Sequence, residues 1–151
     1  MKAISLWQPY ASFMADELKL YETRNRLTHF RGELAICAAQ RKSRYMEFGA
    51  EIEDLILRLG ILHWQRTKLM SPRPALLPLG AVVCVVSVYD CQPVEQVRVS
   101  PLERLVGDYS RGRFAWLTRD CRQLKTPVPV KGKQGFFNLP PEVEAQVRAQ
   151  L

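Results

Sequence analysis

Apolar side chains follow a strand-like pattern over much of the chain. Largely apolar runs of strand length occupy residues 2–7, 33–39 and 79–89. The last of these is the strongest, because valine fills five of its positions, and its nearly continuous apolar character predicts a central strand. Residues 113–117 predict another strand, residues 21–24 an extended stretch, and residues 126–137 an extended segment broken by glycines.

Helical spacing of apolar residues marks other segments. Tyr10, Phe13, Met14 and Leu18 form one stripe of a predicted helix that starts at residues 8–9, since proline is well tolerated in a first helical turn. A second helix is predicted over 48–59, with Gly60 ending it in a left-handed cap. Shorter helices are predicted at 101–106, where Ser100 and Glu103 have capping-box spacing, and after the prolines at 140–141.

These elements predict an α+β fold, namely a small mixed β-barrel with peripheral helices. Strands dominate, and the helices do not alternate with them regularly, which argues against a doubly wound parallel fold. The length of 151 residues and the hydrophobic content of 47% suit one domain with one core. We expect a single domain over 1–151 with a helical and proline-rich insertion at about 43–78, whose part 65–78 has three prolines and predicts an irregular connection.

The chain lacks several signals that would point to other classes of protein. No window contains the apolar run that a membrane span needs, and no secretory signal is recognisable at the start, so a cytoplasmic protein without membrane contact is expected. None of Cys37, Cys84, Cys91 and Cys121 has zinc-site spacing. Free thiols are therefore expected, with no metal and no cofactor.

Positive charge is concentrated in two segments. The net charge is +7, whereas residues 19–44 alone carry +5 and residues 111–133 carry +6. If the fold brings these segments together, they form one basic patch that attracts polyanions through phosphate contacts and counterion release. The alternative is two separate, solvated basic faces.

Lys19, Glu22 and Arg24 form a compact charged motif at the entry to an extended stretch. Because side chains alternate faces along a strand, Glu22 and Arg24 are expected to point the same way. A lysine, a carboxylate and an arginine held together can grip a phosphate or perform proton chemistry, and they can equally form a surface salt bridge.

A set of landmarks in a fixed order covers nearly the whole chain, from about residue 2 to 140. It comprises the run from Ile4 to Ser12, the Lys19-x-x-Glu22-x-Arg24 motif, Arg31-Gly32, residues 79–83, Asp90-Cys91 and residues 129–135. This set resembles the ASCH domain family, named for homology to a transcription coactivator. The family usually has glycine two residues before the motif lysine, whereas this chain has Glu17.

The resemblance implies a fold similar to the PUA superfamily, a small β-barrel with helices and a cleft associated with RNA. Some members of the family look like RNA-binding modules, and others are described as ribonucleases or as amidohydrolases of acetylated cytidine. In the amidohydrolase branch, a lysine at the Lys19 position works with a threonine three residues on and a distant glutamate. This chain has Glu22 three residues on, followed by Thr23.

The expected nucleic-acid-binding residues combine basic, amide and aromatic side chains. Trp7 and Gln8 lie at a strand-to-helix junction, where the indole can stack on a base or pack in the core. Residues 131–135 hold lysines between glycines and form either a second ligand-binding element or an ordinary basic turn. The complete expected set is Trp7, Gln8, Lys19, Arg24, Arg31, Arg111, Lys131, Lys133 and Gln134.

The sequence thus favours a protein that binds single-stranded RNA or a modified nucleotide in a basic cleft. Lys19, Glu22 and Arg24 would form its floor, and residues 131–134 its rim. The alternative is a small RNA-acting hydrolase, a ribonuclease or an amidohydrolase of acetylated cytidine, with Lys19 and Glu22 as the catalytic residues. A further alternative, an interaction domain that uses a helix at 44–60, leaves the protein partner open.

Overall fold

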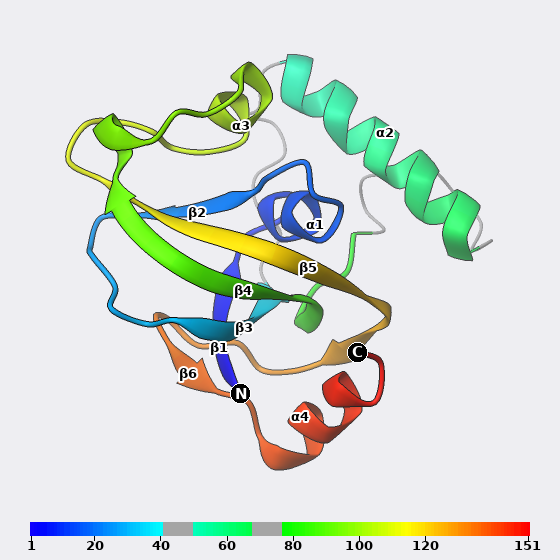
Figure 1. Ribbon diagram of the computed structural model, residues 1–151. Coiled ribbons are helices and arrows are strands. Elements are labelled where there is room, and N and C mark those ends of the chain that lie inside the picture. The colour runs from blue at the N-terminus through cyan, green and yellow to red at the C-terminus, as the bar shows by residue number, and fades with distance from the viewer. Residues whose placement is uncertain (41–49, 68–76) are drawn as a thin grey trace.

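One curled, half-barrel sheet organises the protein in a computed structural model that describes residues 1–40, 50–67 and 77–151 (Figure 1). Its strands follow the order β2-β5-β4-β3-β1-β6, in which β1 and β3 are parallel and the other neighbours antiparallel. The strands are β1 (Lys2–Leu6), β2 (Tyr21–Arg24), β3 (Gly32–Ala38), β4 (Ala81–Pro93), β5 (Phe114–Pro129) and β6 (Phe137–Asn138). This mixed sheet with surrounding helices confirms the predicted α+β, barrel-like fold.

The strand that the sequence analysis divided in two is continuous. Phe114–Pro129 forms one 16-residue strand, β5, rather than a strand at 113–117 and a separate extended segment from 126. Its middle is polar and exposed at Arg119 and Asp120, so the sequence pattern breaks there. The polar middle still forms part of the strand because β5 pairs with the long strand β4 on both sides of it, with shifts of register between the paired segments.

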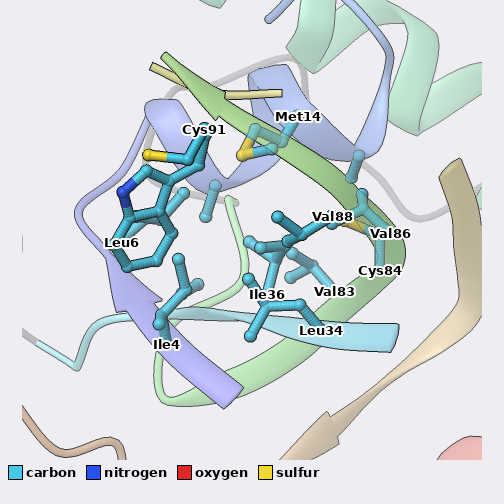
Figure 2. Packing of buried hydrophobic residues seen from close by; sticks show 14 residues of the cluster. Ile4, Leu6, Met14, Leu34, Ile36, Val83, Cys84, Val86, Val88 and Cys91 are labelled. Carbon is cyan, nitrogen blue, oxygen red and sulfur yellow. The ribbon is translucent and has the colours of Figure 1, made fainter. Parts of the chain in front are cut away.

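The concave core lies between the sheet and helix α1 (Tyr10–Ala15). Alternate residues of the central strands contribute Leu34, Ile36, Val86 and Val88, and α1 adds Met14 (Figure 2). All of these side chains are almost completely buried. Burial of this kind contributes about 1.5–3 kcal/mol per large apolar side chain, so this cluster anchors α1 on the sheet.

The opposite face of the central strands is covered by helix α4 (Pro141–Arg148). Ala35, Cys37 and Val85 point to this side and form a second cluster with Val143 and Val147 of α4. Strands buried on both faces have apolar residues at successive positions instead of an alternation. This double coverage explains the valine-rich run of β4, which lies third in the six-strand order, as the prediction of a central strand requires.

Helices α2 (Ala50–Thr67) and α3 (Pro101–Leu105) lie at the end of the sheet near α1. Ile52 and Ile56 of α2 pack against Phe13 and Val106. This part of its predicted apolar stripe is therefore used inside the protein, which weighs against the interaction-domain alternative. Residues 41–49 and 68–76 lie outside the described residues, and with them the predicted helix start at 48 and most of the predicted irregular connection.

The prediction that Gly60 ends the second helix was wrong, because α2 continues through it to Thr67. A glycine inside a helix costs about 1 kcal/mol relative to alanine, which is too little to terminate a helix by itself. Residues 61–66 contain good helix formers such as Leu62 and Gln65, and they continue the helix.

The turn from α1 into β2 is made without glycine. Glu17 has a φ of 57°, in the left-handed region that side chains with a Cβ rarely adopt. The backbone amides of Leu18 and Lys19 both donate to the carbonyl of Phe13, at 2.9 and 3.0 Å, and close the turn. A residue other than glycine at this position thus carries a backbone cost.

Replacing Glu17 with glycine is expected to stabilise the protein by about 0.5–1 kcal/mol, because the relief of left-handed strain exceeds the added entropy of the unfolded chain. Urea unfolding of Glu17→Gly beside the wild type measures the gain. Glu17→Ala is the matched control, since it removes the carboxylate but keeps the Cβ, and it should give no gain. Equal gains in both variants would show that charge, not backbone strain, is the cause.

Candidate functional site

Segments that lie far apart in the sequence line one cavity of about 820 Å³. They come from the C-terminal end of β1 and the start of α1, from β2 and the turn into it, and from the residues directly after β3. The connection from α3 to β5 and the segment between β5 and β6 complete the lining. The polar and aromatic side chains that line it are Ser5, Trp7, Tyr10, Lys19, Glu22, Thr23, Arg24, Gln40, Asp108, Arg113, Lys131, Lys133 and Gln134. Both basic segments of the sequence therefore contribute residues to the same cavity.

Strand β2 brings Glu22 and Arg24 together on one face. Their side chains form an ion pair, with Arg24 Nε 2.8 Å from Glu22 Oε1. Arg24 also donates to the carbonyl of Ser5 and lies 5.9 Å from the ring centre of Trp116. This geometry confirms the expected shared face, and the guanidinium is held by its neighbours rather than free in solvent.

Lys19 is buried just before β2, with only 3% of its side chain exposed. Its Nζ lies 3.9 Å from Glu103 Oε1, and it has no hydrogen-bond partner among the described residues. Burial is the largest influence on this amine, and it lowers the pKa of Lys19 despite the opposing effect of the carboxylates of Glu22 and Glu103. The amine therefore faces the cavity with donor capacity that the described part of the protein does not use.

Burial affects Glu22 in the complementary sense. It raises the pKa of the Glu22 carboxyl, although Lys19, Arg24 and Arg113 all lie near enough to lower it. The neutral forms of Lys19 and Glu22 are thus both favoured relative to the same groups in water. Such shifts are common where titratable groups are placed in a cavity for binding or proton transfer.

Glu103 of α3 holds the residues around Lys19 in place. Its carboxylate accepts hydrogen bonds from the backbone amides of Leu20 and Tyr21 and from the hydroxyl of Tyr109 at 2.7 Å. The residue is 2% exposed. Because the amides belong to the residues directly after Lys19, Glu103 fixes the start of β2 as well as facing the lysine amine.

Arg113 and Asp108 form a further charged pair in the cavity wall. Arg113 Nε lies 3.2 Å from Asp108 Oδ2, and its terminal nitrogen donates to the carbonyl of Thr23 at 3.0 Å. Gly107 precedes this pair in a crowded position, where an added Cβ would lie 2.5 Å from the Tyr109 ring and 3.2 Å from Lys19 Nζ. Glycine at 107 therefore allows this connection to pass close to the lysine.

The rim of the cavity is formed by residues 131–135. The side chains of Lys131, Lys133 and Gln134 are exposed, and neither lysine forms an ion pair with a carboxylate of the described residues. An added Cβ at Gly132 would lie 2.3 Å from Ser5 Oγ. This glycine thus lets the rim segment pack directly onto β1, which places the two lysines beside the cavity.

The side chains of Trp7 and Trp116 differ clearly in solvent exposure. Trp7 lines the cavity and is 59% exposed, whereas Trp116 is buried at 4% and belongs to the core. Of the two roles considered for Trp7, core packing does not fit this exposure. Its indole is available to a ligand.

Three residues expected at the site lie outside the cavity lining. Gln8 is completely buried, donating to the carbonyl of Pro78 at 2.8 Å and accepting from the amide of Ser12 at 3.1 Å, so its amide is used within the protein. Arg31 is 3.0 Å from Asp90 in an ion pair. Arg111 is exposed in the turn before β5. The other six members of the set line the cavity.

Sequence analysis did not identify Glu103, Asp108 or Arg113 as site residues. The capping box predicted for Glu103 is half formed, since its amide donates to Ser100 Oγ at 3.1 Å, but its carboxylate turns toward Lys19 and β2. Local spacing cannot reveal that turn, because the partners are more than eighty residues away. Arg113 did have a signal, as a member of the second basic segment at the start of a predicted strand.

Within the described part of the chain, no group of three His, Cys, Asp or Glu side chains is arranged to hold a metal ion. The helices described there are too short or too polar to cross a membrane. All four cysteines have free thiols.

Comparison with known proteins gave matches only among solved structures. No protein-family model and no curated protein sequence matches the chain. The crystal structure of ASCH from Zymomonas mobilis is similar over 98% of this chain and 93% of that chain, with 15% identity and a TM-score of 0.53. Two point mutants of that protein are similar as well. One has 16% identity and a TM-score of 0.53, and the similarity covers 98% of this chain and 94% of that chain. The other has 13% identity and a TM-score of 0.52, and the similarity covers 98% of this chain and 96% of that chain.

The curled mixed sheet and the helices around it define an α+β protein with a barrel-like fold. Within that class, the chain has an ASCH-like fold, because the similarity to the Zymomonas mobilis structures extends over nearly its whole length. At this level of identity the similarity concerns the fold alone. The function has to be argued from the residues of this chain.

Proposed function

We propose that the cavity binds single-stranded RNA or a modified nucleotide. One observation carries this proposal: an exposed tryptophan, Trp7, and two exposed lysines, Lys131 and Lys133, line the same cavity. Its volume of about 820 Å³ is within the usual range for small-ligand sites. The ASCH-like fold adds support through the RNA-associated cleft that the family resemblance implies.

The two kinds of side chain suit the two parts of a nucleotide. An exposed indole offers a face on which a base can stack, as single-stranded nucleic acids commonly do on aromatic residues. Lysines on flexible stems neutralise phosphates without demanding a fixed geometry. A duplex would not expose its base faces to Trp7, so a single strand is the better match.

Binding is expected to weaken steeply with salt. Fluorescence anisotropy of a labelled octamer of single-stranded RNA, measured over a series of KCl concentrations, gives the slope of log affinity against log salt. Replacing Lys131 and Lys133 with glutamine should reduce the slope by about 1.4, or about 0.7 per phosphate contact on a single strand. Lys2→Gln with Lys125→Gln is the matched control, since both lysines are exposed and outside the cavity lining.

Salt-independent affinity of the wild-type protein, or failure to bind any RNA, would contradict the proposed function. An equal change of slope in the two double variants would show that the contacts are spread over the surface. In that case the protein would bind RNA without using this cavity.

A second function, amide hydrolysis on acetylated cytidine or cleavage of RNA, is favoured by the burial and the lowered pKa of the Lys19 amine. Its buried amine has a lowered pKa and lies 3.9 Å from a carboxylate oxygen of Glu103. A neutral amine can take a proton from water, whose oxygen then adds to the acetyl carbon. The resulting ammonium returns that proton to the exocyclic nitrogen as the C–N bond breaks, which gives acetic acid and cytidine. Because the neutral amine is the active form, the rate should rise with pH through the Lys19 pKa.

Incubation with 4-acetylcytidine and with labelled single-stranded RNA tests this second function. Release of cytidine and acetate, or of shortened RNA, that is lost in Lys19→Arg would establish it. No turnover over hours, with RNA binding intact, would leave the binding function alone.

A further inference from the structure

The cations on the floor of the cavity are matched one to one by carboxylates. We define the floor as Lys19, Arg24 and Arg113 with their acidic partners. Arg24 is paired with Glu22 at 2.8 Å, Arg113 with Asp108 at 3.2 Å, and Lys19 with Glu103 at 3.9 Å. With all six groups charged, the floor has no net charge. The positive charge of the cavity therefore lies at its rim, on Lys131 and Lys133.

This distribution is unfavourable for a phosphate on the floor. A phosphate that approached Lys19 or Arg24 would also approach the carboxylates that already neutralise them, and like charges repel strongly where burial limits screening. An uncharged ligand group avoids this cost. The rim lysines, by contrast, are exposed and unmatched by carboxylates of the described residues, so phosphates are favoured there.

The floor nevertheless has hydrogen-bonding capacity to offer. Lys19 Nζ and Ser5 Oγ belong to residues that line the cavity, are buried, and have no hydrogen-bond partner among the described residues. Glu22, three residues after the lysine, lines the same cavity and provides a carboxylate acceptor there. A donor beside an acceptor matches an uncharged group that carries an acceptor beside an N–H.

We propose that the floor binds the uncharged hydrogen-bonding edge of a nucleobase, while the rim lysines bind the neighbouring phosphates. With uracil, Lys19 Nζ donates to a ring carbonyl, and the adjacent ring N–H donates to Glu22. This edge is the one used in Watson–Crick pairing, so the base must be unpaired and enter the cavity. The inference rests on the proposed function and specifies which part of the nucleotide each region recognises.

Methylation at two positions of the same base separates the floor contact from all others. A uridine octamer is compared with octamers of 3-methyluridine and of 5-methyluridine by anisotropy. The 3-methyl group replaces the ring N–H, so affinity should fall about tenfold, as expected for loss of a bidentate base contact. The 5-methyl group likewise replaces a ring hydrogen by a methyl group, but at C5, which lies outside the edge that carries the ring N–H, and affinity should change by less than about twofold.

Two further probes assign the rim. An abasic octamer of equal charge should bind at least as weakly as the 3-methyluridine octamer, since it retains only the phosphates. Lys131→Gln with Lys133→Gln should weaken binding of the uridine octamer but leave the affinity for free uridine, measured by NMR titration, unchanged.

The outcomes distinguish failure of this inference from failure of the proposed function. If the uridine and abasic octamers bind equally, or if the two methylated octamers have the same affinity, the floor does not recognise a base edge, although the protein still binds RNA. If loss of the rim lysines weakens free uridine as much as the octamer, the division between floor and rim is wrong. If no octamer binds, both the inference and the proposed function are overturned.

Discussion

Replacing Glu103 with alanine is expected to destabilise the protein by about 3–5 kcal/mol, the range for removing one partner of a buried charge pair. Three hydrogen-bond donors lose their acceptor at once: the amides of Leu20 and Tyr21 and the hydroxyl of Tyr109. Each buried donor left unsatisfied costs about 1–3 kcal/mol. The amine of Lys19 also loses the carboxylate that lies 3.9 Å away.

Urea unfolding measures this loss directly. Glu142→Ala is the matched control, because Glu142 is an exposed residue of a helix first turn and should change stability by less than about 0.5 kcal/mol. Glu103→Gln should be intermediate, since its amide oxygen can still accept but its charge is gone. If Glu103→Ala were no more destabilising than Glu142→Ala, Glu103 would not be the support of the site that the geometry indicates.

Replacing Trp7 with alanine is expected to weaken RNA binding about tenfold to a hundredfold without unfolding the protein. Stacking of one base on an aromatic side chain is worth about 1–3 kcal/mol, which gives a change of this size. The indole is 59% exposed, so its removal opens no core cavity. The melting temperature should therefore stay close to that of the wild type.

Tyr89→Ala provides the matched control for Trp7. Tyr89 is also an exposed aromatic residue, at 41%, but it lies outside the cavity lining. Anisotropy with the labelled octamer should show a loss of affinity for Trp7→Ala and little change for Tyr89→Ala. Similar affinities for the two variants would remove the argument that base stacking occurs at this cavity.

Local sequence patterns predicted an element of the fold well where the same few residues also determine how that element packs. The valine-rich run of β4 indicated a central strand because both of its faces are buried, and the Ser100 cap marked the start of α3. The alternation rule also placed Glu22 and Arg24 on one face of β2. In each case the decisive information is contained within a few neighbouring residues.

The sequence could not predict contacts that depend on distant segments. Gln8 has the composition of a ligand-binding side chain, but the carbonyl of Pro78, seventy residues away, holds its amide inside the protein. Gly60 was expected to end α2, yet the surrounding residues continue the helix. Composition alone did not show how the charges pair. The two basic segments predicted a positively charged cavity, but Glu103 and Asp108 neutralise Lys19 and Arg113 on its floor.

The most direct test of the central claim is to locate bound RNA on the protein by ¹H–¹⁵N NMR titration with the single-stranded octamer. We predict the largest shift changes for the amides of Trp7, Lys19, Gly107 and residues 131–135, which surround the cavity. Amides near Tyr89 and Arg119, outside the cavity lining, should change little. Shift changes centred on that second region, or no saturable changes at all, would contradict the assignment of this cavity as an RNA-binding site.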